Sequence, residues 1–69
     1  MTPEQKARQQ IDRQLIQAGW SLQDYSQLNI SAAQGVAVRE FPLTTGFADY
    51  LLYTNGKAIG SVEAKPEGF

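Results

Sequence analysis

Three charged side chains in the second half of the chain have the types and spacing of a metal-dependent phosphodiesterase site. Asp49 lies at the start of one apolar run, and Glu63 and Lys65 close the next one. Phosphodiester cleavage requires negative charge to be neutralised, and Mg²⁺ does this while it is held by one or two carboxylates. Asp49 and Glu63 are therefore the predicted metal ligands. Lys65 is predicted to orient the attacking water or to balance the developing charge.

The same three residues also fit a simpler interpretation. Asp49, Glu63 and Lys65 would form a cross-strand ion pair at the solvated end of a hairpin, worth well under ~1 kcal/mol. Spacing alone leaves both interpretations open.

The turn between the two runs decides whether a site can form. Asn55-Gly56 between two apolar runs is a strong hairpin signal. With a two-residue loop, Asp49 would face away from Glu63. A three-residue loop that includes Thr54, or a bulge near Gly46 or Asp49, would bring the two acids to one face. The site therefore depends on a shift of one residue in register.

A helix is predicted at the N-terminus. Thr2 is a suitable N-cap, Pro3 suits the first helical position, and Gln5 completes a capping box. Gly19 is the expected stop. One apolar stripe recurs at helical spacing and consists of Ala7, Ile11, Leu15 and Ala18.

The polar face of this predicted helix carries Lys6, Arg8 and Arg13. These cations either contact phosphate groups or belong to a solvated surface, and the second interpretation is favoured because exposed helix positions normally carry charge. Residues 21–25 are expected to form a turn or a short 3₁₀ segment.

A strand is predicted from Val36, Val38 and Phe41, with Arg39 and Glu40 between them. Strict alternation places Glu40 on the same face as the two valines. Pairing of this strand with residues 49–53 would bring Glu40 near the predicted metal, whereas the alternative makes it part of an exposed strand end.

Composition restricts the function classes. The chain has 69 residues, a net charge of −1, and neither cysteine nor histidine. We therefore expect one small domain, no disulfide framework, no thiolate or imidazole metal site, and no strongly basic DNA clamp. No apolar run approaches ~20 residues and the N-terminus lacks a secretory apolar core, so we expect no membrane segment and a cytoplasmic location.

The sequence resembles the PD-(D/E)xK nuclease region at the start of the restriction (R) subunit of type I restriction-modification enzymes. The matching segments cover nearly the whole chain: 18–20 (AGW), 36–41 (VAVREF), 46–52 (GFADYLL) and 62–65 (VEAK). Ala48 stands where the motif has its proline. A lone acid with a Glu-x-Lys triplet is weakly specific, but the ordered combination with an Asn-Gly-Lys turn is much more so.

The resemblance implies an enzyme activity and a set of partners. Asp49 and Glu63 would hold Mg²⁺, Lys65 would be the catalytic lysine, and Glu40 would be an accessory acid. The substrate would be duplex DNA, cut by a type I site-specific deoxyribonuclease with modification and specificity subunits as partners. Further nuclease elements and an ATP-driven motor would follow in the complete subunit, so the 69-residue chain alone is expected to be inactive.

The expected fold is α/β (α+β), with residues 1–69 forming the leading part of a restriction-endonuclease-like domain. One N-terminal helix would pack on a mostly antiparallel sheet of about three strands. The alternative function is non-catalytic: a truncated remnant or interaction module that keeps the hairpin. One helix covers one sheet face, so the other face would seek a partner or self-associate.

Overall fold

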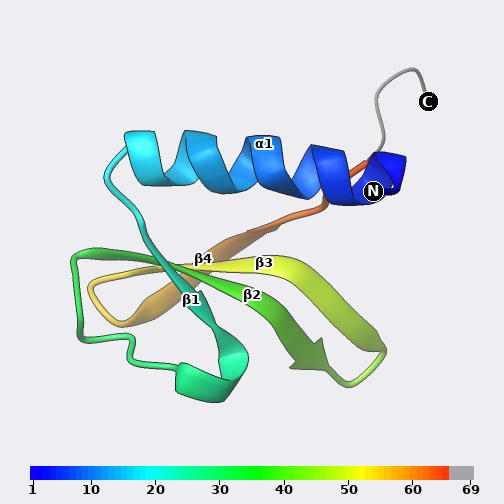
Figure 1. Ribbon diagram of the computed structural model, residues 1–69. Coiled ribbons are helices and arrows are strands. Elements are labelled where there is room, and N and C mark those ends of the chain that lie inside the picture. Colours follow the sequence, from blue (N-terminus) through cyan, green and yellow to red (C-terminus); the bar gives the residue numbers. More distant parts are fainter. Residues whose placement is uncertain (66–69) are drawn as a thin grey trace.

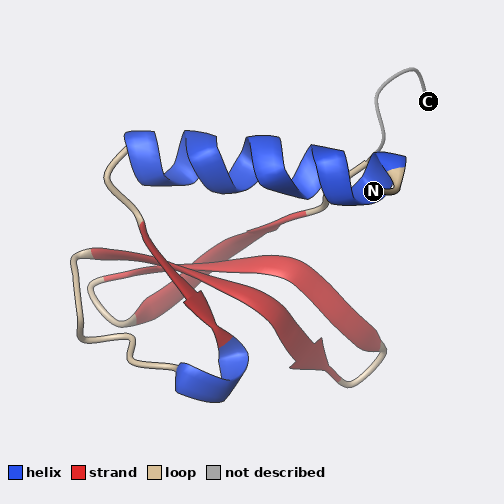
Figure 2. Cartoon of the chain, viewed as in Figure 1, coloured by secondary structure: helices blue, strands red, loops and turns tan. Residues whose placement is uncertain are grey.

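One α-helix lies across one face of a four-stranded mixed sheet in the computed structural model, which describes residues 1–65 (Figures 1 and 2). The fold is therefore α+β, as predicted, but the expectation of three strands was wrong. Within the described residues, no helix is long and apolar enough to cross a bilayer. The elements are α1 (Pro3–Gln17), β1 (Ser21–Asp24), the 3₁₀ helix η1 (Tyr25–Gln27), β2 (Gly35–Leu43), β3 (Gly46–Thr54) and β4 (Lys57–Val62).

The ends of α1 follow the predicted signals. The Thr2 hydroxyl accepts a hydrogen bond from the Gln5 backbone N–H at 3.1 Å, and the Gln5 side-chain oxygen accepts from the Thr2 N–H at 2.8 Å. After Gln17, Gly19 adopts a φ of 94°, and the Trp20 N–H donates to the Leu15 carbonyl. The capping box and the glycine stop are therefore confirmed.

The additional strand is β1, which pairs in parallel with β2 at the sheet edge. A turn or 3₁₀ segment was expected over residues 21–25, but the 3₁₀ segment begins only at Tyr25. The strand is short and has Leu22 as its one apolar residue, so it carries no periodic apolar signal. The Gln23 side chain accepts from the Asn29 N–H and donates to the Asn29 carbonyl, which fixes the following loop. Non-local pairing and this loop contact form the strand.

The register of the β3–β4 hairpin results from a turn and a bulge that differ from those expected. Its loop is the two-residue Asn55-Gly56, with φ values of 51° and 79°, and Thr54 pairs with Lys57. The three-residue loop was therefore wrong. A bulge within β4 then shifts the register, because Tyr53 pairs with Ala58 but Leu52 pairs with Gly60. The extra residue lies in β4, not near Gly46 or Asp49 as expected.

Replacement of Gly56 by alanine tests the turn. A residue with a Cβ is disfavoured at a φ of 79°, so we expect Gly56→Ala to lower the free energy of unfolding by about 1 kcal/mol in a urea titration. Gly60→Ala is the matched control, because a Cβ there meets no heavy atom within 4 Å and the backbone has no positive φ. Equal losses from both substitutions would contradict the role of the turn.

The core between α1 and the sheet is small. Ala7, Tyr50 and Ala64 are its buried members, and Ile11 and Leu15 pack against them. The predicted helix stripe is confirmed for its first three residues, whereas Ala18 is exposed because the helix has already ended at Gln17. The centre of β2 is also fully buried through Val36, Ala37 and Val38. The core therefore positions β3 against the helix at Tyr50.

Candidate functional site

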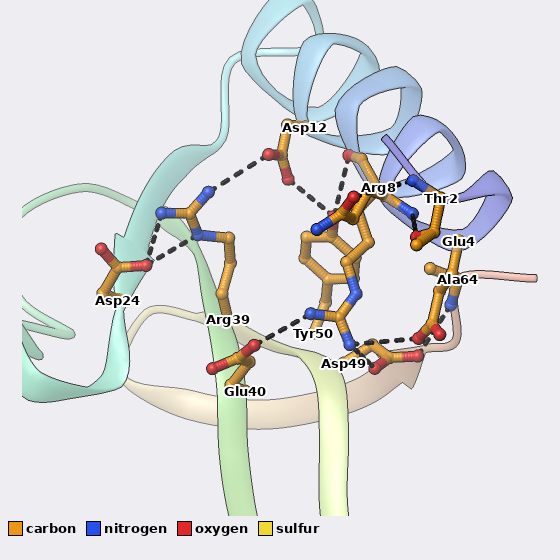
Figure 3. A network of polar contacts seen from close by, with 11 residues as sticks. Thr2, Glu4, Arg8, Asp12, Asp24, Arg39, Glu40, Asp49, Tyr50 and Ala64 are labelled. Atoms are coloured by element: carbon orange, nitrogen blue, oxygen red, sulfur yellow. Dashed lines mark hydrogen bonds and ion pairs between the residues drawn. The ribbon is translucent and has the colours of Figure 1, made fainter.

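Asp49 lies at the centre of a group of polar contacts between α1 and the sheet (Figure 3). Its Oδ2 accepts a hydrogen bond from the Ala64 backbone N–H at 2.9 Å, and its Oδ1 accepts from Arg8 Nη2 at 2.7 Å. The side chain is 21% exposed. The Asp49 carboxylate therefore joins the helix, β3 and the segment after β4.

Register brings the segments that carry Asp49 and Glu63 close to each other. Beyond the β4 bulge, Tyr50 pairs with Val62, the last pair of the β3–β4 ladder, and Asp49 and Glu63 are the next residues of the two segments. The hydrogen bond from the next backbone N–H, that of Ala64, to Asp49 shows that the chain continues alongside β3 there. The shift of one residue required by the sequence argument has thus occurred, by means of a bulge at an unexpected place.

Glu63 and Lys65 themselves are exposed. Val62 packs against the core cluster and Ala64 is buried in it, so the residues that alternate with them face solvent. Among residues 1–65, neither Glu63 nor Lys65 forms an ion pair. The simpler interpretation of a cross-strand pair with Lys65 is therefore wrong in its partner, because Asp49 pairs with Arg8.

Glu40 lies on β2, the strand next to that of Asp49. Pairing of β2 with β3 is regular on both sides of it, from Arg39 with Tyr50 to Phe41 with Ala48. Glu40 itself has a φ of 53°, which is uncommon for a residue with a side chain and interrupts the ladder at this point. Its Oε1 accepts a hydrogen bond from Arg8 Nη1 at 2.9 Å. Glu40 therefore shares a cation with Asp49.

Arg8 is the residue that links these acids. It also pairs with Glu4, one helical turn earlier, at 3.3 Å. Burial lowers the pKa of Arg8, but its hydrogen bond with Glu40 and the charges of Asp49 and Glu4 outweigh this and raise the pKa above its usual value. The solvated-surface interpretation of Arg8 was therefore wrong, and the side chain is a permanent cation between two strands and a helix.

A second polar group lies beside the first and centres on Tyr50. The Tyr50 hydroxyl donates to Asp12 Oδ1 at 2.6 Å and lies 3.0 Å from the Arg8 backbone carbonyl oxygen. Arg39 Nη1 contacts Asp12 at 3.2 Å, and Arg39 Nε donates to Asp24 at 2.8 Å. Burial, and then the hydrogen bond and charge of Asp12, raise the pKa of Tyr50, which the charges of the two arginines lower only in part.

These groups line one cavity of about 280 Å³ between α1 and the β2–β3 pair. Its walls carry both arginines and four of the acids just described: Arg8, Asp12, Asp24, Arg39, Glu40 and Asp49, together with Tyr50. Such a surface suits small polar or ionic ligands rather than apolar ones.

The acidic side chains of the candidate site determine whether Mg²⁺ could be held there. Within residues 1–65, no group of three or more acidic side chains is close enough to hold a metal ion unaided. Mg²⁺ nevertheless needs only one or two carboxylates, with waters filling its other positions. Asp49 and Glu63 are ligands of this chemical type, and each Asp49 oxygen retains a lone-pair direction beyond its hydrogen bond to Arg8 or Ala64. By donor chemistry alone, these side chains fit a cation that takes few protein ligands.

Sequence reasoning missed the pairing role of the helix. Glu4, Arg8 and Asp12 recur every four residues, directly beside the apolar stripe that begins at Ala7. A polar stripe adjoining the buried stripe lies at the edge of the helix–sheet interface, so this spacing was the available signal.

Comparisons with protein-family models, with curated proteins and with solved structures gave no match for this chain.

Proposed function

We propose that this unit is the N-terminal part of a Mg²⁺-dependent, DNA-cleaving domain of a type I restriction subunit with a restriction-endonuclease-like fold. The observation that carries the proposal is the hydrogen bond from the Ala64 N–H to the Asp49 carboxylate, which, with the Tyr50–Val62 pair beyond the β4 bulge, holds the segment that carries Glu63 beside Asp49. Two carboxylates that hold a divalent cation, followed by a lysine that assists the water, can hydrolyse a phosphodiester. The resemblance of the sequence to the nuclease region supports the same reaction.

Each residue has a distinct role in this proposal. When bound, Mg²⁺ would neutralise charge on the scissile phosphate and lower the pKa of a bound water. Asp49 and Glu63 would hold the cation, and Glu40 would be an accessory acid, linked to Asp49 through Arg8. The Lys65 ammonium is exposed, two residues beyond Glu63, so it is free to orient water or to approach a phosphate.

The wider activity belongs to the proposal as well. The substrate is duplex DNA, and the partners are the modification and specificity subunits of a cytoplasmic restriction complex. ATP-driven translocation would be supplied by other domains. With a net charge of −1, this chain itself offers little electrostatic attraction to DNA, so basic surface elsewhere in the subunit must hold the duplex.

Lys65→Ala tests the proposal by nicking of supercoiled plasmid in Mg²⁺, with the longer subunit that carries this region. Loss of a positioned cation at the reacting phosphate should slow nicking by about 100-fold. Lys57→Ala is the control, because Lys57 is also exposed but begins β4 at its far end. Equal nicking by the parent and the Lys65 variant would remove Lys65 from the mechanism.

A second candidate is a non-catalytic interaction module, which is favoured by the exposure of the β2–β3 hairpin tip. Phe47 is 74% exposed and Leu43 is 47% exposed on adjoining strand ends. Exposed apolar groups of this kind are typical of docking surfaces. Unchanged nicking in every site variant, together with no divalent-cation binding, would favour this function over the nuclease.

A further inference from the structure

Arg8 occupies the space between the acids of the candidate site. We propose that Arg8 is an internal counter-cation that competes with the divalent cation for Asp49 and Glu40, so that cation binding releases the helix side chain from the sheet. This inference rests on the proposed function, because it concerns the same acids. It assigns a positioning role to a helix residue outside the triplet motif.

The geometry is that of a cation already bound. Arg8 extends from α1 past Tyr50, and its two terminal nitrogens reach different strands (Figure 3). Nη1 lies 2.9 Å from Glu40 Oε1 on β2, and Nη2 lies 2.7 Å from Asp49 Oδ1 on β3. A guanidinium is planar, permanently charged and forked, so it satisfies two carboxylates at once. A divalent cation at Asp49 would meet this positive charge at close range.

Arg8 also has an alternative ion-pair partner on its own helix. Its Nη2 already lies 3.3 Å from Glu4, an exposed acid one turn earlier on α1 that is not a predicted metal ligand. Its Nε is buried and has no hydrogen-bond partner among the described residues. An unsatisfied buried donor is unfavourable, so the bridged position carries a cost that movement of the side chain would relieve. Movement toward Glu4 would keep one ion pair and expose the Nε.

The test is the affinity of the purified chain for Mn²⁺, measured by calorimetry. Removal of the competing charge in Arg8→Gln should tighten binding roughly tenfold, as expected for like charges a few ångströms apart near a surface. Arg13→Gln is the matched control, since Arg13 is an exposed arginine of the same helix and forms no ion pair within residues 1–65. Its affinity should stay within about twofold of wild type.

A substitution of Glu4 provides a second, independent test by the same measurement of Mn²⁺ affinity. Glu4→Gln removes the alternative partner of Arg8, so it should weaken Mn²⁺ binding by roughly twofold. In an Arg8→Gln background the same change should have no effect, because Glu4 acts only through Arg8. An equal loss in both backgrounds would show that Glu4 attracts the cation directly, and would overturn the release route.

The outcomes separate the two proposals. Equal or weaker Mn²⁺ binding by Arg8→Gln would overturn competition while leaving the metal site intact. Absence of Mn²⁺ binding by both proteins would overturn the metal site and the competition together. Should Arg8→Gln fail to fold, nuclear magnetic resonance of the wild-type arginine side chains decides. Saturating Mg²⁺ should shift the Arg8 Nε–H signal but not that of Arg13, and an unmoved Arg8 signal would overturn the proposal.

Discussion

Tyr50→Ala should leave most of the chain unfolded in dilute buffer at 25 °C. Tyr50 is the largest fully buried side chain, 1% exposed, and it packs with Ala7 and Ala64 between the helix and the sheet. Truncation of a buried aromatic residue costs about 3–5 kcal/mol. A domain of this size has a total stability on the order of 5 kcal/mol, so little would remain. Far-UV circular dichroism and urea unfolding measure the loss. Tyr25→Ala is the control, because Tyr25 is 46% exposed.

Tyr50→Phe separates the ring from its hydroxyl. The hydroxyl donates to Asp12, and its loss should cost about 1 kcal/mol at neutral pH. Burial, followed by the hydrogen bond to Asp12, raises the pKa of Tyr50. The unfolded chain therefore ionises first as the pH rises past about 10, and stability falls there in the wild type. The phenylalanine variant lacks this contribution, so its loss above pH 10 should be smaller. Identical pH profiles would contradict a buried neutral tyrosine.

Local signals predicted the parts of the fold that local chemistry determines. The helix start rests on Thr2 and Gln5, which bond to each other, and its end rests on Gly19. Asn55-Gly56 predicted the hairpin because both residues accept positive φ values. By contrast, β1 is a four-residue strand at a sheet edge with Leu22 as its one apolar residue, and its pairing with β2 depends on contacts distant in sequence. No local pattern could have indicated it.

The candidate site shows the same division. The sequence indicated Asp49 and Glu63 as acids on neighbouring strands, but their register depends on a bulge in β4 beside Gly60, a signal that the sequence argument did not use. Arg8 was interpreted as a surface cation because exposed helix positions normally carry charge. Its three acidic partners come from α1, β2 and β3, so its role appears only when the sheet is assembled. Pairing between distant elements, rather than composition, creates this site.

Asp49→Asn should have the largest effect on the proposed chemistry. Asparagine keeps the shape of the side chain and an oxygen that can accept from the Ala64 N–H, but it removes the charge. Mn²⁺ affinity should fall by at least about 100-fold, since even loss of an outer partner of a metal ligand costs 10–100-fold. Plasmid nicking by the proposed nuclease subunit should fall by about 1000-fold. Calorimetry and nicking assays give the two values.

Stability provides the internal check on this prediction. Arg8 retains Glu40 and Glu4 as partners after Asp49→Asn, so the free energy of unfolding should fall by only about 1–2 kcal/mol. Asp24→Asn is the control, because Asp24 pairs with Arg39 in the same cavity but is not a predicted ligand. If both variants bound Mn²⁺ as tightly as the wild type while remaining folded, Asp49 would be a structural acid that ties α1 to the sheet. The register that aligns it with Glu63 would then serve folding rather than hydrolysis.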